Sequence, residues 1–216
     1  MIFVNFKTYK EAAGERALSL ARVILEVSQE SGVKIIACPQ AIDLREVVKV
    51  GCSVWAQHVD AVEQGKSTGW FPPEVAKEAG VSGVLLNHSE HKLTTGILGE
   101  TMARSKELGL ATLVFADSPE EALVVVKFQP DYLAYEPPEL IAAPTTSVAR
   151  SKPEIIEKVA REITDVQFLV GAGVKDSQDV KISLERGAKG IVLSSAVILS
   201  DDPKKVLEDL ASGFQK

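Results

Sequence analysis

A glutamate at the end of an apolar run is the residue best placed to do chemistry in this sequence. Glu136 follows the run of residues 132–135 and precedes Pro137 and Pro138. Because proline has a fixed φ and no N–H, the chain must leave a β-sheet directly after Glu136. The carboxylate is then held at a rigid strand end with a loop behind it, a position suited to a general base under a mobile lid. The alternative is a solvated acid that ends a strand.

Polar and small residues follow several other apolar runs. They are Asn5, Lys7, Gln57, His88, Ser89, Glu90, Gly171, Ala172, Gly173, Ser194 and Ser195. This set supplies an imidazole, an ammonium, amide and hydroxyl donors, and small residues that expose backbone N–H groups to an anion. Considered alone, each residue has an alternative interpretation: Lys7 as a surface lysine, and His88 as a hydrogen-bonded core histidine. His88 and His91 have a metal-ligand spacing, but no third ligand cluster accompanies them, so we expect no metal.

Eight short apolar runs recur along the chain, and they predict eight strands. They cover residues 2–6, 34–38, 54–57, 83–87, 111–115, 132–135, 167–170 and 190–193. Each run is nearly continuous in apolar character, which is typical of parallel strands buried on both faces. Helical periodicity separates the runs, with helix starts indicated at Ser118 before Pro119, at Ser151 before Pro153 and Glu154, and at Asp201 and Asp202 before Pro203.

This alternation predicts a single (β/α)8 barrel domain over residues 1–216. The structural alternative is an open dinucleotide-binding sheet, but the segment from Gly171 to Asp176 lacks the third glycine of the GxGxxG fingerprint. The chain is shorter than the typical ~250 residues of such barrels. We therefore expect shortened or missing helices, above all near residues 57–73 or 117–125.

Composition restricts the class of partner. The chain is 45% hydrophobic and 25% charged, with a formal net charge of −6. This charge argues against nucleic acid and against an anionic membrane, whereas a small anionic substrate needs only local N–H groups and a cation. Cys38 and Cys52 have no CxxC spacing and read as reduced thiols. With no apolar run near ~18 residues, we expect a cytoplasmic protein without a membrane partner.

The same segments resemble the triosephosphate isomerases, of the short archaeal type, over essentially the full length of the chain. The motifs that carry the resemblance are Val4-Asn5-Phe6-Lys7-Thr8-Tyr9, Ala56-Gln57-His58-Val59-Asp60, Thr68-Gly69, Leu86-Asn87-His88-Ser89-Glu90, Ala134-Tyr135-Glu136-Pro137-Pro138-Glu139-Leu140-Ile141, Ser151-Lys152-Pro153-Glu154 and Gly171-Ala172-Gly173-Val174. The resemblance implies a TIM barrel that interconverts dihydroxyacetone phosphate and D-glyceraldehyde 3-phosphate. It implies no cofactor.

The resemblance also implies a role for each site residue. Glu136 matches the base, His88 the electrophile, Lys7 the cation near the developing oxyanion, Asn5 its neighbour and Glu90 an acid beside the site. The substrate and its phosphate are assigned to Ile141 and Ala142 of the lid and to Gly171, Ala172, Gly173, Ser194 and Ser195. A helix beginning after Ser89 or at Thr94 would keep the His88 imidazole neutral, an effect already established for this family.

Several positions depart from the family pattern. The lid reads Ala142-Ala143-Pro144-Thr145 where a Gly-Thr-Gly run is usual, so its hinge freedom is in question. Ser194 and Ser195 stand where many relatives have glycine. None of these changes removes a catalytic side chain.

The resemblance further implies self-association. In the family, the loop that here runs from His58 to Pro72 inserts beside the active site of a neighbouring subunit, which implies a homodimer or a homotetramer. Two other functions remain open at this point. One is a barrel aldolase in which Lys7 forms a Schiff base, and the other is a non-catalytic barrel that binds a sugar phosphate or a partner.

Overall fold

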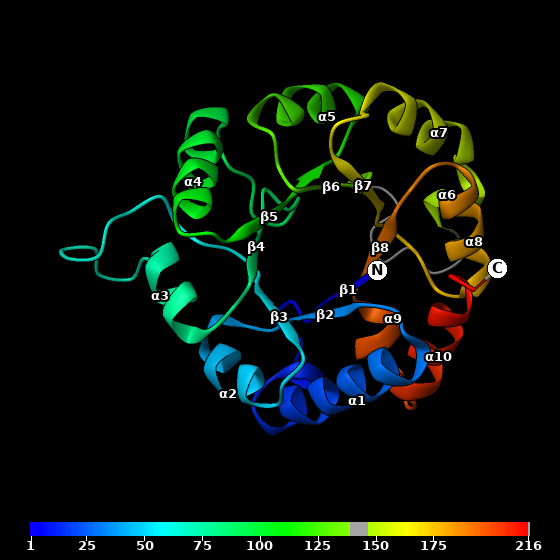
Figure 1. The fold of residues 1–216 in the computed structure, drawn as a ribbon, viewed down its shortest axis with the longest axis horizontal. Helices are drawn as coiled ribbons and strands as arrows, with labels where there is room; N and C mark the ends of the chain where they lie inside the picture. The colour runs from blue at the N-terminus through cyan, green and yellow to red at the C-terminus, as the bar shows by residue number, and fades with distance from the viewer. Residues whose placement is uncertain (139–146, 216) are drawn as a thin grey trace.

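The eight apolar runs form eight parallel strands that close into a barrel (Figure 1). The computed structural model describes residues 1–138 and 147–215. The strands are β1 Ile2–Asn5, β2 Ile35–Cys38, β3 Ser53–Ala56, β4 Gly83–Leu86, β5 Ala111–Ala116, β6 Tyr132–Tyr135, β7 Gln167–Val170 and β8 Gly190–Leu193. They pair in sequence order, and β8 closes on β1 with Ile191 opposite Ile2. The predicted (β/α)8 TIM barrel is confirmed, with every strand within one residue of its expected bounds.

The barrel interior is filled by alternate side chains of the strands, as the two-residue period of a β-strand requires. Phe3, Trp55 and Tyr132 meet edge to face, with 5.0 Å between the ring centroids of Phe3 and Trp55. Gly83 makes room for this cluster, because a Cβ at that position would lie 2.4 Å from the Trp55 ring. The intervening side chains point outwards and pack under the helices.

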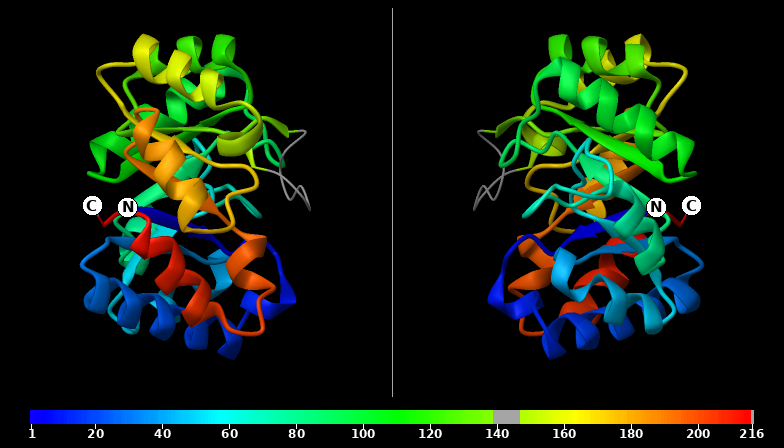
Figure 2. Two further views of the ribbon diagram at one scale, coloured as in Figure 1. Left: turned by 90° about the vertical axis from the view of Figure 1, so that its right-hand side faces the viewer. Right: turned by 90° about the vertical axis from the view of Figure 1, so that its left-hand side faces the viewer.

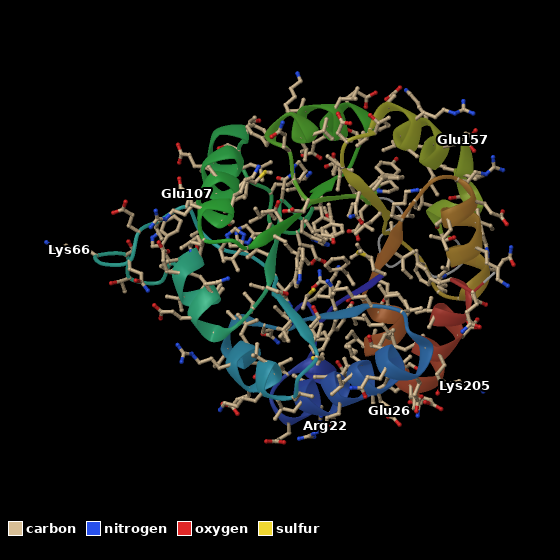
Figure 3. The ribbon with its side chains drawn as sticks, in the orientation of Figure 1. Arg22, Glu26, Lys66, Glu107, Glu157 and Lys205 are labelled. Atoms are coloured by element: carbon tan, nitrogen blue, oxygen red, sulfur yellow. The ribbon has the colours of Figure 1, made fainter. Side chains whose placement is uncertain are left out.

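The helices surround the barrel (Figure 1). They are α1 Glu15–Ser31, α2 Leu44–Lys49, α3 Pro73–Ala79, α4 Thr95–Glu107, α5 Pro119–Val125, α6 Val148–Ser151, α7 Pro153–Glu162, α8 Ser177–Glu185, α9 Ser195–Ile198 and α10 Pro203–Ser212, with 3-10 turns η1 Lys10–Ala12, η2 Ala41–Asp43 and η3 Val126–Phe128. α10 packs against α1, so the last helix completes the ring beside the first (Figure 2). Charged side chains such as Arg22, Glu107 and Glu157 point away from the barrel, into solvent (Figure 3).

All three predicted helix starts are confirmed, two of them with a side-chain cap. The side chains of Ser118 and Asp202 accept hydrogen bonds from the first turns of α5 and α10, each with proline directly after the cap. At the third, α7 begins at Pro153 as expected, but Ser151 does not cap it: Ser151 ends α6, which Ser147 caps, and Lys152 stands at the N-cap of α7. A four-residue helix is too short to show periodicity, so α6 could not be predicted from the hydrophobic pattern.

The expected shortening of the outer layer is present. A loop without a helix joins β3 to α3 and projects from the barrel, with Lys66 at its tip (Figure 3). α5 has seven residues and α9 has four. In the part of the chain that the structure describes, no helix is both long and apolar enough to cross a membrane.

Candidate active site at the carboxyl end of the barrel

The predicted site residues meet because strand alternation continues past the last interior layer of the barrel. Glu136 follows the interior residue Ala134 by two positions, and Ser194 follows Val192 in the same way. Their side chains therefore lie above the packed interior, at the end where the strands finish. A cavity of about 240 Å³ at this end is lined by Asn5, Lys7, Tyr9, His88, Glu136, Ala172, Gly173, Val174, Lys175, Val192, Leu193, Ser194, Ser195 and Ala196.

The carboxylate of Glu136 is the buried acid of this cavity. Its side chain is about nine-tenths buried, and its main-chain N–H donates to the carbonyl of Ala116 at 2.9 Å. One carboxylate oxygen, Oε2, lies 3.2 Å from Nε2 of His88. The two groups that the sequence assigned to proton transfer and to polarisation are therefore adjacent.

Gly171 supports Glu136 by having no side chain. A Cβ at position 171 would lie 2.0 Å from Oε1 of Glu136, so any larger residue would displace the carboxylate. The N–H of Gly171 already donates to the carbonyl of Tyr135 at 3.0 Å. Gly171 thus makes room for Glu136, and its assignment to phosphate binding stays a prediction.

Backbone geometry fixes the tautomer of His88. Nδ1 of His88 accepts the main-chain N–H of Glu90 at 3.1 Å, so Nδ1 carries a lone pair and the ring proton of the neutral imidazole is on Nε2. This N–H comes from the turn after β4. The helix α4 begins later, with Thr94 as its cap, so of the two predicted starts Thr94 is confirmed and Ser89 is not used. The edge-on ring of Phe115, 4.8 Å away between centroids, packs against the imidazole.

Asn87 precedes His88 and ties the turn after β4 to neighbouring segments, and sequence reasoning did not single it out as a site residue. Its φ of 61° is a left-handed conformation that asparagine tolerates better than most residues. Its amide donates to the carbonyl of Phe115 and to the carboxylate of Glu121, both at 2.9 Å, and accepts the N–H of Leu93 at 3.0 Å. An asparagine at a strand end directly before a candidate imidazole was the available signal.

Lys7 is held by both its backbone and its ammonium. Its φ is 46°, and its N–H donates to Oδ1 of Asn5 at 3.0 Å. The amide of Gln57 donates to the carbonyls of Lys7 and Cys38, both at 2.9 Å. Nζ lies 2.7 Å from the exposed carboxylate of Glu90. Its ammonium is thereby placed at the cavity wall rather than in solvent, so the surface-lysine alternative is wrong.

The opposite wall offers unpaired hydrogen-bond donors. Within residues 1–138 and 147–215, the backbone N–H groups of Ala172, Gly173, Ser194 and Ser195 have no hydrogen-bond partner. The Ser194 hydroxyl is also buried without a partner in that part of the chain. Convergent N–H and O–H donors at a cavity wall suit an anion that occupies the cavity.

A second, adjoining cavity lies on the other side of Lys7. Its walls include Gln57, His58, Glu90 and His91. The rings of His58 and His91 stack with centroids 4.1 Å apart, and Nε2 of His58 lies 3.1 Å from the carboxylate of Asp60. Burial lowers the pKa of His58 from its usual 6.5, and this outweighs the opposing effect of Asp60.

Two expectations from the sequence remain, one on the predicted lid and one on a metal site. Ile141 and Ala142, with the rest of the predicted lid to Thr145, lie outside the described residues. Among the described residues, no group of three or more histidine, cysteine, aspartate or glutamate side chains is arranged to hold a metal ion.

A closed parallel barrel with a carboxylate, an imidazole and an ammonium around one cavity at its carboxyl end defines a (β/α)8-barrel enzyme. A sequence model of the family described as triosephosphate isomerase matches residues 1–211. The triosephosphate isomerase of Methanopyrus kandleri is 44% identical over 99% of this chain and 97% of its own length. That of Methanothermus fervidus is 41% identical over 97% and 96%. The chain belongs to the triosephosphate isomerase family and is an isomerase.

A solved structure supports the fold independently of close sequence similarity. The crystal structure of triosephosphate isomerase from Bartonella henselae matches with a TM-score of 0.77 at 18% identity, over 100% of this chain and 98% of that one. At this identity the likeness concerns the barrel itself.

Proposed function

We propose that this chain interconverts dihydroxyacetone phosphate and D-glyceraldehyde 3-phosphate through an enediolate, with Glu136 as the base. The observation that carries the proposal is the 3.2 Å approach of the Glu136 carboxylate to Nε2 of His88 in a cavity that Lys7 also lines. A base and two oxyanion donors at one cavity are what proton transfer next to a carbonyl requires.

In the first step, a Glu136 carboxylate oxygen removes a proton from the carbon next to the carbonyl. The electron pair of that C–H bond forms the carbon–carbon double bond of the enediolate, and the carbonyl π pair moves to oxygen. Protonated Glu136 then returns the proton to the neighbouring carbon, the former carbonyl carbon. A proton also passes from the hydroxyl oxygen of the first carbon to the oxyanion, so the first carbon becomes the new carbonyl and the second oxygen becomes the hydroxyl. One carboxylate that reaches both carbons therefore serves as base and then as acid.

The charge that develops on the substrate oxygens is met by two fixed donors. His88, with its ring proton on Nε2, and the ammonium of Lys7 both line the cavity, where they can donate to the developing charge. Glu90 holds the ammonium at 2.7 Å, so Lys7 is a paired cation rather than a free amine nucleophile. This pairing argues against the Schiff-base aldolase.

The substrate phosphate binds at the cavity wall whose amides have no partner among the described residues. The N–H groups of Ala172, Gly173, Ser194 and Ser195 and the Ser194 hydroxyl supply the hydrogen bonds, without an arginine cluster. Two of these residues follow β7 and two follow β8, where phosphate is frequently bound in barrels of this kind.

We also propose that the chain forms a homo-oligomer through the projecting loop between β3 and α3. The loop carries Trp70 with 59% of its surface exposed, which is unusual for a large aromatic residue. The family resemblance supplies the partner, a second copy of the chain.

A coupled assay on glyceraldehyde 3-phosphate tests the reaction. Glu136→Gln should lower kcat by ~10²–10⁴, the usual contribution of a positioned acid–base group, while the melting temperature and phosphate affinity stay close to wild type. Glu120→Gln, on the exposed face of α5, is the matched control and should have no effect. A Glu136→Gln protein that keeps more than about half of wild-type turnover removes Glu136 as the base.

A further inference from the structure

A second fully buried carboxylate lies close to the cavity but does not line it. Asp179, in the first turn of α8, is 0% exposed. A buried carboxylate is costly unless hydrogen bonds and a cation satisfy it. Its environment shows which segments it joins.

The donors to Asp179 come from two segments that are distant from each other in sequence, the start of α6 and the loop after β7. Oδ1 accepts the Ser147 hydroxyl at 2.7 Å and lies 3.0 Å from Nε of Arg150, both in the segment that begins α6. Oδ2 accepts the main-chain N–H of Lys175 at 2.9 Å, in the loop after β7. α6 and α8 pack against each other at this point (Figure 1).

Helix capping does not explain this arrangement. The cap of α8 is Asp176, whose side chain accepts the N–H of Asp179 at 3.0 Å. The Asp179 side chain is thus free to bond outside its own helix, and it does so with both oxygens. Asp176 takes a different position, on the surface, where it pairs with the guanidinium of Arg150.

The loop that Asp179 holds is the one that offers amides to the cavity. Ala172 and Gly173 both have left-handed φ values, 63° and 77°. For alanine this conformation is unfavourable, so surrounding contacts must maintain it. The carbonyl of Ala172 accepts the N–H of Val148, which ties the same loop to α6 a second time, at 3.3 Å.

We propose that Asp179 is a positioning residue for the anion-binding wall: it joins the start of α6 to the loop after β7 and so keeps the amides of Ala172 and Gly173 directed into the cavity. This inference rests on the proposed function only in taking the anion to be the substrate phosphate. Asp179 itself does not touch the ligand.

Asp179→Asn is the primary test, because it keeps the shape but replaces one acceptor oxygen by an amide that cannot accept from Ser147 or Lys175. The dissociation constant of inorganic phosphate, measured by calorimetric titration, should rise at least about fivefold, and KM should rise with it. The kcat should stay within about twofold, because the base and the imidazole are untouched.

Asp176→Asn is the matched control. Asparagine caps a helix as well as aspartate does, so this variant loses only an exposed ion pair and should bind phosphate as wild type does. Should Asp179→Asn fail to fold, Ser147→Ala decides instead. It removes the hydroxyl that donates to Asp179 and that also caps α6, and it should weaken phosphate binding in the same direction.

A purely structural role predicts a different pattern. A folded Asp179→Asn protein with a lowered melting temperature but unchanged phosphate affinity and KM would overturn the inference, as would unchanged phosphate affinity in Ser147→Ala where that variant decides. A wild-type chain without isomerase activity, but with phosphate binding that Asp179→Asn weakens, would remove the proposed function and support the inference.

Discussion

Gly171 and Glu136 lie so close that a single methyl group on Gly171 would occupy the place of the Glu136 carboxylate, at 2.0 Å from Oε1. The base is thus positioned by the absence of a side chain on the neighbouring strand. This relationship leads directly to the first prediction.

Gly171→Ala should lower kcat by ~10²-fold or more, because a displaced base loses its alignment with the substrate carbon. The coupled assay and the melting temperature should be measured for Gly171→Ala and for the control Gly96→Ala. At Gly96 an added Cβ meets nothing within 4 Å, so that control should keep full activity. Near-normal turnover in Gly171→Ala would show that Glu136 acts from another position.

Ser194→Ala should change ligand binding and stability in opposite directions. The hydroxyl is buried without a partner in the described part of the ligand-free chain, so its removal should raise the melting temperature slightly. In the complex, a hydrogen bond to a charged phosphate contributes ~1.5 kcal/mol or more, so KM should rise about tenfold. An unchanged KM together with a lowered melting temperature would assign Ser194 to the scaffold.

His58 should make stability depend on pH near neutrality. Burial lowers its pKa from 6.5, so below that value the unfolded chain binds a proton that the folded chain does not. The stabilisation is complete above 6.5 and is lost as pH falls through the folded-state pKa. His58→Gln, which keeps a donor for Asp60, should therefore flatten the rise of melting temperature between about pH 5 and pH 7.

Two other groups define the control for this experiment. The amino group of Met1 has a pKa lowered by burial, and further by Lys34, to about 6, so it titrates in every variant and only the difference in slope is informative. His91→Gln retains the titrating His58 and should keep part of the slope. Equal slopes in wild type and His58→Gln would assign the pH dependence elsewhere.

Trp70→Lys should shift the chain towards monomer. A large exposed aromatic residue on a projecting loop suits burial in a partner, and a lysine there would leave a charge in the interface. Light scattering at micromolar concentration measures the mass. Leu199→Lys, at a comparably exposed apolar residue after α9, should keep the wild-type mass. A wild-type monomer with full activity would contradict the proposed oligomer.

The sequence by itself determined the barrel and the placement of its chemical groups along the chain. Continuous apolar runs predicted the strands, and proline after a capping residue predicted the starts of α5 and α10. Pro137 marked the point where the chain leaves β6, directly after Glu136. These signals are local: each depends on the conformational limits of a few consecutive residues. Small residues after β7 and β8 likewise indicated where an anion would bind.

Only the tertiary structure decided how those groups are held. Gly171 makes room for Glu136 from 35 positions away, and Asp179 is joined to Ser147 across 32 positions. In the sequence, the first is an ordinary small residue and the second an ordinary acid in a helix. The space beside a carboxylate and the burial of a side chain depend on how separate βα units pack around the barrel, and no period or spacing within one unit encodes that packing.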